Sequence, residues 1–285
     1  MRTVKQKIPA KVNLTLDIVG KTTNYHKIKS LVASINLYDT ITVKKRRDNL
    51  ITLREKGYKA NCPIEENNAY KTARVFMDMF FTPGVDIIIN KKIPLAGGLG
   101  GSSADSVAVL KAMNKLYDIN GAMHPLAAQI GSDTCYMLNG GFAVISGRGT
   151  EVEKVRSRRK LYLIIIVDET GVSAKEGYAL YDKMEIEKNP TTDVAVSLIS
   201  KRSKGALEHF STMVKNDLYL PAVEKVPAIK TNVSRLFESG AIASTVSGSG
   251  SCTYGIYRSI KDRNNAYKKL LEIYPEDKLI KVETI

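Results

Sequence analysis

Residues Lys91 to Asp105 read KKIPLAGGLGGSSAD, in which four glycines follow a single proline. The β-branched run before this stretch, Val85 to Asn90, is typical of a strand. After it, apolar residues recur at helical spacing from Val109 to Leu116, which predicts an amphipathic helix. Ser102 stands three residues before Asp105, the spacing of a capping box, so we expect the helix to begin just past the glycines.

A glycine-rich loop that ends at a helix N-terminus is typical of an anion-binding site. Free backbone N–H groups and the helix dipole attract negative charge there, and the missing glycine side chains let phosphate oxygens come close. The loop differs from two better-known motifs. No lysine precedes Ser102, as a Walker loop requires, and Ser103 stands where a dinucleotide fingerprint has its third glycine. The structural alternative is an ordinary glycine-rich turn.

The composition indicates an enzyme-sized globular protein without disulfides or zinc. A chain of 285 residues with 44% hydrophobic content forms one large or two modest domains, and we favour two. Its three histidines have no histidine partner at i+3 or i+4, which argues against a zinc hydrolase. Its cysteines are widely spaced and are predicted to be buried thiols: Cys62, Cys135 and Cys252.

The N-terminus lacks the apolar core of a signal peptide, and no apolar run approaches the ~20 residues of a membrane span. We therefore expect a cytoplasmic protein with no membrane partner. The net charge of +14 permits either a nucleic-acid partner or a small polyanionic substrate. The basic runs at 44–47, 156–160 and 201–204 are interpreted as solvated loop faces, the first in a hairpin turn between strands at 41–43 and 50–53.

Two polar pairs near the N-terminus are candidates for function. The strand predicted from Ile8 to Ile18 places Lys11 and Asn13 on one face, a cation beside a neutral hydrogen-bonding group. The alternative is a solvated strand face. Tyr25 and His26 together suit stacking on a base and hydrogen bonding to its edge, and the alternative is an ordinary loop.

Further along the chain, Asn67 is predicted to cap a helix, and Asp133 lies between small residues before a turn. The run 161–167 is continuously apolar, which predicts a strand buried on both faces and the start of a second structural unit. The Gly-Ser turn at 247–251 lies between two strand-like runs, and it presents backbone N–H groups from a second direction unless it is merely a flexible hairpin.

The segment from Pro94 to Asp105 resembles the central motif of the GHMP kinases, the superfamily of galactokinase, homoserine kinase, mevalonate kinase and phosphomevalonate kinase. Within it, the motifs PAKVNL at 9–14, Tyr25-His26, Gly-Ser-Asp at 131–133 and Ser-Gly-Ser-Gly at 247–250 are similar to those of the diphosphocytidyl-methylerythritol kinases. The chain departs from this pattern at several places, among them Val246 for a methionine and Thr23-Asn24 for Asp-Gly. Cys135 replaces a proline, Ala174 replaces a threonine, and the loop before His26 is one residue shorter.

Strands and helices mix without regular alternation, which favours an α+β fold. The resemblance implies the GHMP kinase fold, with a ribosomal-protein-like N-terminal domain at 1–158 and a ferredoxin-like C-terminal domain at 159–285. It places the active site in the cleft between the two halves. We expect a monomer or weak homodimer that binds no nucleic acid.

The resemblance implies ATP-dependent phosphorylation of a hydroxyl on a diphosphocytidyl polyol in isoprenoid biosynthesis, with Mg²⁺ held mostly by phosphates and not by a protein metal site. The alternatives are a GHMP kinase with another acceptor and a basic nucleic-acid-binding protein. The implied catalytic residues are Lys11 and Asp133. The implied nucleotide-binding residues are Asn67, Lys91, Pro94, Gly97, Gly98, Leu99, Gly100, Gly101, Ser102 and Ser103. The implied substrate-binding residues are Asn13, Tyr25, His26, Tyr178, Ser247 and Gly248.

Overall fold

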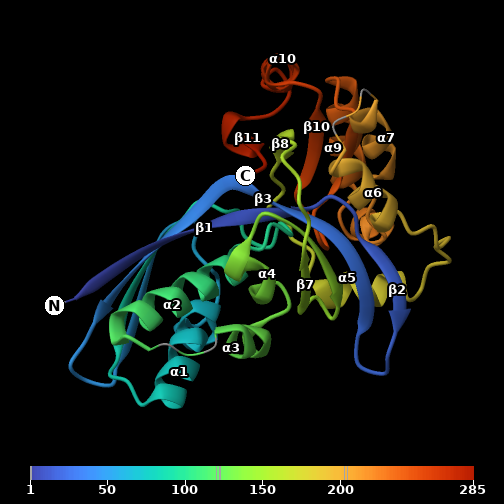
Figure 1. Cartoon of the computed structure of the whole chain (residues 1–285). Helices are drawn as coiled ribbons and strands as arrows, with labels where there is room; N and C mark the ends of the chain where they lie inside the picture. Colours follow the sequence, from blue (N-terminus) through green and yellow to red (C-terminus); the bar gives the residue numbers. More distant parts are fainter. Residues whose placement is uncertain (1, 120, 122, 202, 204) are drawn as a thin grey trace. The chain divides into compact units, whose positions relative to one another are not determined.

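The computed structural model describes residues 2–119, 121, 123–201, 203 and 205–285 (Figure 1). Arg202 and Lys204 of the third basic run therefore lie outside the described residues. The chain divides into two compact units. Unit 1 comprises Met1–Ala10, Leu37–Leu95 and Gly100–Asn139, and unit 2 comprises Lys11–Asn36, Ala96–Leu99 and Gly140–Ile285. The predicted domain division after residue 158 stays a prediction.

Unit 1 is built around a β-α-β segment. Strand β4 (Ile51–Gly57) leads through a short 3-10 turn (Ile64–Glu66) and helix α1 (Asn68–Phe80) to strand β5 (Val85–Lys91), which runs parallel to β4. The strand predicted from Val85 is thus confirmed.

The hairpin predicted around the first basic run is wrong. Strand β3 (His26–Lys45) pairs antiparallel with β5, and β4 lies on the far side of β5 in the sheet order β4-β5-β3. Lys44 and Lys45 continue β3, while Arg46 pairs with Asp48 and with Asp86 of β5. The helical crossover through α1 explains the parallel pairing, because a chain that crosses over by a helix returns in the same direction.

Helices cover one face of this part of the sheet. Helix α2 (Gly101–Tyr117) lies beside α1, and α3 (Met123–Ile130) and α4 (Thr134–Asn139) follow it (Figure 1). The apolar positions predicted to form the inner face of α2, including Val109 and Leu116, are buried. The helix predicted after the glycines is therefore confirmed.

The larger sheet has seven strands, with β6 (Phe142–Gly147) and β7 (Glu151–Lys154) completing the order β4-β5-β3-β6-β7. Strands β1 (Thr3–Asn13) and β2 (Asp17–Lys21) also pair with β3. The single strand predicted from Ile8 to Ile18 is thus interrupted after Asn13. A solvated strand face is wrong as well, since Lys11, Asn13 and Thr15 are all buried.

The second sheet belongs to unit 2 and has the order β11-β8-β10-β9, with every pair antiparallel. Its strands are β8 (Tyr162–Ile166), β9 (Ala243–Val246), β10 (Thr253–Tyr257) and β11 (Leu279–Glu283). Side chains from α9 (Ala228–Glu238) and α10 (Ile260–Leu270) pack on it, and a short 3-10 turn (Glu276–Lys278) precedes β11. The buried apolar strand β8 is therefore confirmed, and so is the ferredoxin-like half of an α+β fold.

The remaining helices of unit 2 are α5 (Ala174–Tyr181), α6 (Thr192–Ile199), α7 (Ala206–Met213) and α8 (Tyr219–Lys225). The first strands of the chain are bound to these later segments. Leu16 forms an isolated bridge with Asn216, and the Tyr254 hydroxyl donates to the Asn13 carbonyl at 2.7 Å. Unit 2 therefore combines an early segment, Lys11–Asn36, with much later parts of the chain.

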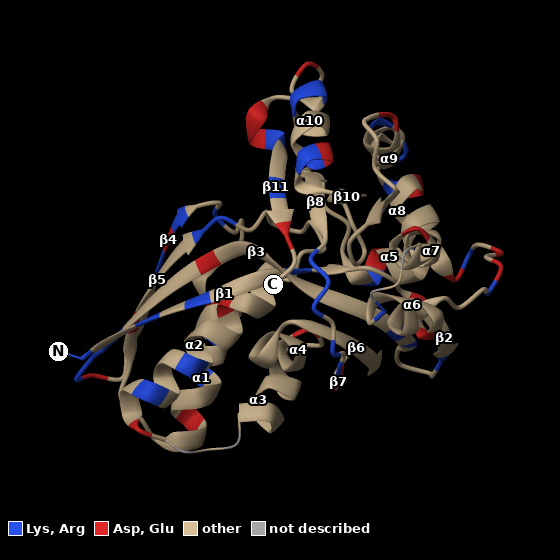
Figure 2. Cartoon of the chain, turned by 45° about the horizontal axis from the view of Figure 1, so that its top comes forward, with Lys and Arg blue, Asp and Glu red and all other residues tan. Residues whose placement is uncertain are grey.

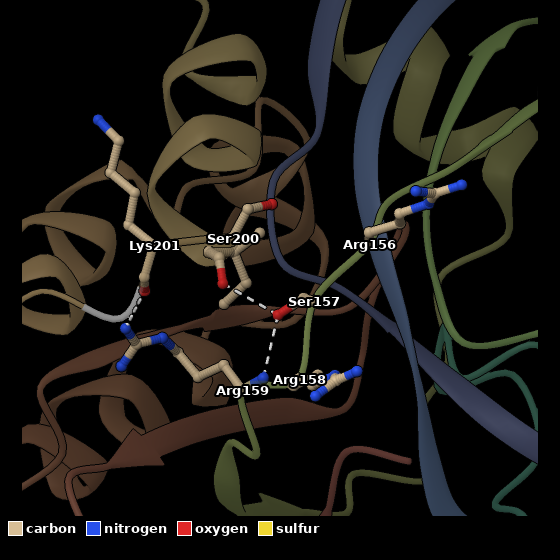
Figure 3. A pocket seen from close by; sticks show the side chains of 7 residues that line it. Arg156, Ser157, Arg158, Arg159, Ser200 and Lys201 are labelled. Carbon is tan, nitrogen blue, oxygen red and sulfur yellow. Dashed lines mark hydrogen bonds between the residues drawn. The ribbon is translucent and has the colours of Figure 1, made fainter.

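The second basic run forms the connection between β7 and β8, visible as a blue coil in Figure 2. With the end of α6 it lines a cavity of about 790 Å³ (Figure 3). The Ser157 hydroxyl donates to the Ile199 carbonyl, and the Arg159 guanidinium donates to the Lys201 carbonyl. The exposed side chains of Arg156 and Lys201 point in different directions, as expected for a solvated loop face (Figure 3).

The predicted burial of the cysteines is confirmed at two of the three positions. Cys135 and Cys252 are buried thiols as predicted, but Cys62 is exposed because it lies in the irregular segment between β4 and α1, which contributes no buried side chain before Ala69.

No helix in the described ranges combines the length and apolar character needed to cross a bilayer.

Candidate active site

The glycine loop leads into the first turn of α2. Gly100 is the N-cap, with φ 73°, and α2 starts at Gly101, so the helix begins within the second glycine pair. A left-handed φ favours glycine at this position. The predicted capping box is wrong: Ser102 is exposed, Asp105 bonds elsewhere, and no described side chain caps α2. The first-turn N–H groups of α2 are therefore left to other acceptors.

Both ends of the loop are tied to one buried ion cluster in unit 1. The Lys91 ammonium, at the end of β5, lies 2.6 Å from Asp39 Oδ2 and 2.6 Å from Asp105 Oδ2 of α2. Asp39 Oδ1 also accepts the backbone N–H of Lys92 and of Ile93, at 2.6 and 2.8 Å. Lys91 thus joins the strand before the loop to the helix after it.

The two carboxylates of this cluster differ in their surroundings. Asp39 accepts three hydrogen bonds, whereas Asp105 Oδ1 is buried and has no partner in the described part of the chain. Burial raises the pKa of the Asp105 carboxyl to about 7, although the Lys91 charge opposes this shift. The same two carboxylates raise the pKa of Lys91 against the effect of its burial, so Lys91 stays charged. The nucleotide contact that the resemblance implies for Lys91 stays a prediction.

Unit 2 brings three of the predicted motifs together. The Lys11 ammonium donates to Asn13 Oδ1 at 2.5 Å, and both side chains are buried. The Lys11 N–H donates to the Leu99 carbonyl of the glycine loop at 3.0 Å. The Ser247 hydroxyl accepts from the Asn13 N–H and donates to the Gly98 carbonyl. The opening strand, the loop and the Gly-Ser turn therefore form one hydrogen-bonded cluster.

Gly98 has to be glycine for a second reason besides its φ of 74°. A Cβ built there would lie 1.8 Å from the Ser247 carbonyl oxygen, a distance at which no side chain fits. A Cβ at Gly248 would lie 3.5 Å from the Lys11 ammonium. The two glycine turns therefore pack backbone against backbone, next to a buried cation.

Asn216 holds the Gly-Ser turn in place, and sequence reasoning gave it no role in the site. Its Nδ2 donates to the carbonyls of Val246 and Gly248, at 3.1 and 2.8 Å. Its Oδ1 accepts the Leu218 N–H at 2.9 Å. The Ser249 hydroxyl further donates to the Val172 carbonyl, which joins the turn to the segment before α5.

Asp133 immediately precedes α4 in unit 1, where its carbonyl accepts the Met137 N–H at 3.0 Å. Cys135, which replaces the family's proline, is buried within α4. A Cβ built at Gly131 would lie 4.0 Å from the Ser103 hydroxyl, so the turn that carries Asp133 borders the start of α2. Of the two loop serines, Ser103 is the one near this turn.

Other residues predicted to bind nucleotide or substrate lie at the start of the first helix, in the glycine loop and in the turn between β2 and β3. Asn67 is the N-cap of α1, as predicted, since its Oδ1 accepts the Ala69 N–H at 2.9 Å and its Nδ2 donates to Glu55. Pro94 and Gly97 are buried in the loop. Tyr25 is 39% exposed, at the tip of the turn between β2 and β3.

The imidazole of His26 stacks on the Tyr178 ring, with centroids 4.7 Å apart and an interplanar angle of 6°. Its Nε2 lies 2.8 Å from Asp182 Oδ1. The predicted aromatic and histidine pair thus has Tyr178 of α5 as an additional neighbour. Asp182 was missed because it lies 156 residues from His26, and no local spacing links them.

The described residues include no group of three or more His, Cys, Asp or Glu that could hold a metal. Mg²⁺ commonly uses only one or two carboxylates together with phosphate oxygens and water. The Ser103 hydroxyl, beside the turn that carries Asp133, is an oxygen ligand of the kind that Mg²⁺ accepts in such a set.

Two family models match the chain. The GHMP kinases N terminal domain matches residues 67–147, and the GHMP kinases C terminal domain matches residues 199–276. Among curated proteins, the 4-diphosphocytidyl-2-C-methyl-D-erythritol kinase of Clostridium botulinum (strain Alaska E43 / Type E3) is 34% identical over 93% of this chain and 95% of its own length. The protein of the same name from Acetivibrio thermocellus is 31% identical, over 95% of each chain.

Solved structures have the same fold. A 4-(cytidine 5'-diphospho)-2C-methyl-D-erythritol kinase superposes with a TM-score of 0.81 at 23% identity, covering 98% of each chain. A mevalonate kinase from L. major superposes with a TM-score of 0.77 at 16% identity, covering 99% of this chain and 96% of its own. At these identities the superpositions establish the fold alone.

Proposed function

Because the chain belongs to the GHMP kinases, in the family of the 4-diphosphocytidyl-2-C-methyl-D-erythritol kinases, we propose that it transfers the γ-phosphoryl group of ATP to a hydroxyl of that diphosphocytidyl polyol. It is thus an ATP-dependent kinase of isoprenoid biosynthesis. The structural observation that best supports this role is the cluster in which buried Lys11 and Asn13 lie against the glycine loop and the Gly-Ser turn.

The triphosphate site in this proposal is the glycine loop. The first-turn N–H groups of α2 are uncapped by any described side chain, and Gly100 carries no Cβ that would keep phosphate oxygens away. The Ser247 hydroxyl donates to the Gly98 carbonyl, and the Asn216 amide donates to the Gly248 carbonyl. These hydrogen bonds preorganise both turns. Preorganised donors stabilise transition-state charge because they need no reorganisation during the reaction.

The chemical step joins the acceptor oxygen to the γ-phosphorus and breaks its bond to the β,γ-bridging oxygen, so that ADP leaves. In this proposal Asp133 accepts the proton of the acceptor hydroxyl, and the Lys11 ammonium stabilises the developing negative charge. Asn13 keeps Lys11 oriented through the 2.5 Å hydrogen bond, and its own Nδ2 donates to the buried Ser30 hydroxyl at 2.8 Å. Mg²⁺, when bound, neutralises phosphate charge.

The acceptor is tested by incubating the protein with ATP, Mg²⁺ and one of several acceptors, and measuring ADP release. The panel contains diphosphocytidyl-methylerythritol, mevalonate, phosphomevalonate, homoserine and galactose. We expect the first compound to exceed the others by up to about four orders of magnitude in kcat/KM, because a site that hydrogen-bonds a substrate rejects analogues lacking those groups. Ala174 removes one hydroxyl at a cost of roughly 1 kcal/mol, too little to change the ranking. Turnover of another acceptor alone would reassign the substrate.

Nucleic-acid binding is the second candidate, and the cationic cavity favours it. No ion pair within the described ranges joins Arg156, Arg158 or Lys201 to an acidic side chain. Among the described residues no aromatic side chain lines the cavity, however, and stacking platforms are the usual partners of such charge in single-strand binding. We expect no saturable binding of oligonucleotides near physiological salt. A micromolar isotherm there, weakening steeply with log salt, would support this second function.

A further inference from the structure

His26 is held in one orientation by the end of α5. Its ring stacks on Tyr178 and meets Tyr181 edge-on, with centroids 6.0 Å apart and an interplanar angle of 84°. Its Nε2 lies 2.8 Å from Asp182 Oδ1, and only 8% of the side chain is exposed. Stacking fixes the plane of the ring, and the Asp182 contact fixes its rotation within that plane.

Asp182 also holds the other end of the turn that carries Tyr25. Its Oδ2 accepts from the Lys21 ammonium at 2.7 Å. Lys21 is the last residue of β2 and His26 is the first of β3, so one carboxylate joins both ends of the turn to α5. Within the turn, Thr22 Oγ1 accepts the Tyr25 N–H at 3.1 Å and the Thr22 N–H donates to the Tyr25 carbonyl.

The Asp182 contact determines which imidazole nitrogen remains for a ligand. The hydrogen bonds from Lys21 and His26 lower the pKa of the Asp182 carboxyl, which keeps it ionised at neutral pH. An ionised carboxylate only accepts hydrogen bonds, so Nε2 has to carry the proton. Nδ1 has no hydrogen bond in the described part of the chain and is the nitrogen left to face a base.

We propose that Asp182 is a specificity-determining positioning residue, which fixes the His26 imidazole so that the site accepts a cytosine base and rejects uracil. This inference rests on the proposed function. At ring positions 3 and 4, cytosine presents an acceptor and a donor, whereas uracil presents a donor and an acceptor. Because the orientation of the His26 ring and the position of its Nε2 proton are fixed, Nδ1 can pair with only one of these two arrangements. The other base leaves a desolvated polar group unpaired.

The test compares two acceptors, diphosphocytidyl-methylerythritol and its uridine analogue, in the wild type and in Asp182→Asn. The Asn amide can donate to Nε2, so it no longer enforces a proton on that nitrogen. We expect KM for the cytidine acceptor to rise about 10- to 100-fold, with kcat within about threefold of wild type. The ratio of kcat/KM between the two acceptors should fall at least tenfold. Asp182→Glu, which keeps a carboxylate, should restore part of that ratio.

Asp193→Asn is the matched control, because Asp193 forms another ion pair between β3 and a helix of unit 2, with Lys29 at 2.6 Å. It should leave both acceptors unchanged. A spectroscopic readout is independent of turnover: the ring ¹⁵N shifts of His26, one of three histidines, should show a protonated Nε2 that changes in Asp182→Asn and not in Asp193→Asn.

The outcomes of these experiments distinguish a failure of the proposed kinase function from a failure of the positioning role of Asp182. A wild type that phosphorylates neither acceptor would overturn the proposed function and, with it, this assignment. A cytidine-selective wild type whose Asp182→Asn variant weakens both acceptors equally would overturn this assignment alone, since a purely structural role moves both KM values together.

Discussion

Replacing Asp133 by asparagine should lower kcat by roughly two to four orders of magnitude while leaving ATP affinity nearly unchanged. An amide cannot accept the proton of the acceptor hydroxyl, and general-base assistance contributes in this range. Because Asp133 lies at the start of α4 and its backbone carbonyl makes the helical bond to Met137, the substitution keeps the local hydrogen bonding of the main chain. Steady-state kinetics at saturating ATP and acceptor, with ATP affinity from calorimetry, measure both quantities.

Asp78→Asn provides the matched control, since Asp78 is an exposed residue of α1 and the same change of charge occurs there. It should turn over at the wild-type rate. If Asp133→Asn also does so, with an unchanged far-UV spectrum, the proton has another acceptor and the assignment of Asp133 fails.

Replacing Lys91 by methionine should cost about 3–5 kcal/mol of unfolding free energy, the range for removing one partner of a buried ion pair. The substitution keeps much of the side-chain volume but leaves Asp39 and Asp105 buried together without a cation. Denaturant unfolding measures the loss. Lys92→Met, at the exposed neighbouring position, should change stability little. A Lys91→Met protein of wild-type stability with weakened ATP binding would instead support the direct nucleotide contact.

Asp105 gives this cluster a dependence on pH with a defined sign. Its pKa is raised to about 7 in the folded protein, against about 3.9 for an unfolded aspartate. The folded state therefore holds more protons between these values, and this group's contribution to stability falls as pH rises from about 4 to about 7. Asp105→Asn should remove that part of the slope, whereas a slope unchanged in the variant would assign it to other groups.

Sequence was most informative where the signal is local. The glycines, the helical spacing after Val109 and the apolar strand β8 are encoded within single segments, and the structure agrees with each of them. Asn67 was read as a helix cap on the same basis and is one. The loop, the opening strand and the Gly-Ser turn were singled out from their residues, the family resemblance implied their roles, and all three meet in unit 2.

Several of the sequence predictions that the structure contradicts concern residues whose partners are distant in sequence. The hairpin failed because β4 pairs with β5 across a helix, although β3 is nearer in sequence. The capping box failed because Asp105 is recruited by Lys91, fourteen residues earlier. Asp39 carries no local sign of its role, since a single carboxylate within an alternating strand usually faces solvent.

The hydrogen bond from Tyr254 to Asn13 joins residues 241 positions apart, and it relates the site to the timing of synthesis. A ribosome adds about 5–20 residues per second, so the amino-terminal strand waits roughly 10–50 s for this partner to be made. During that interval Leu14 and Leu16, buried in the finished protein, lack the later segments that cover them. Lys11 and Asn13 therefore gain their final environment only near the end of translation.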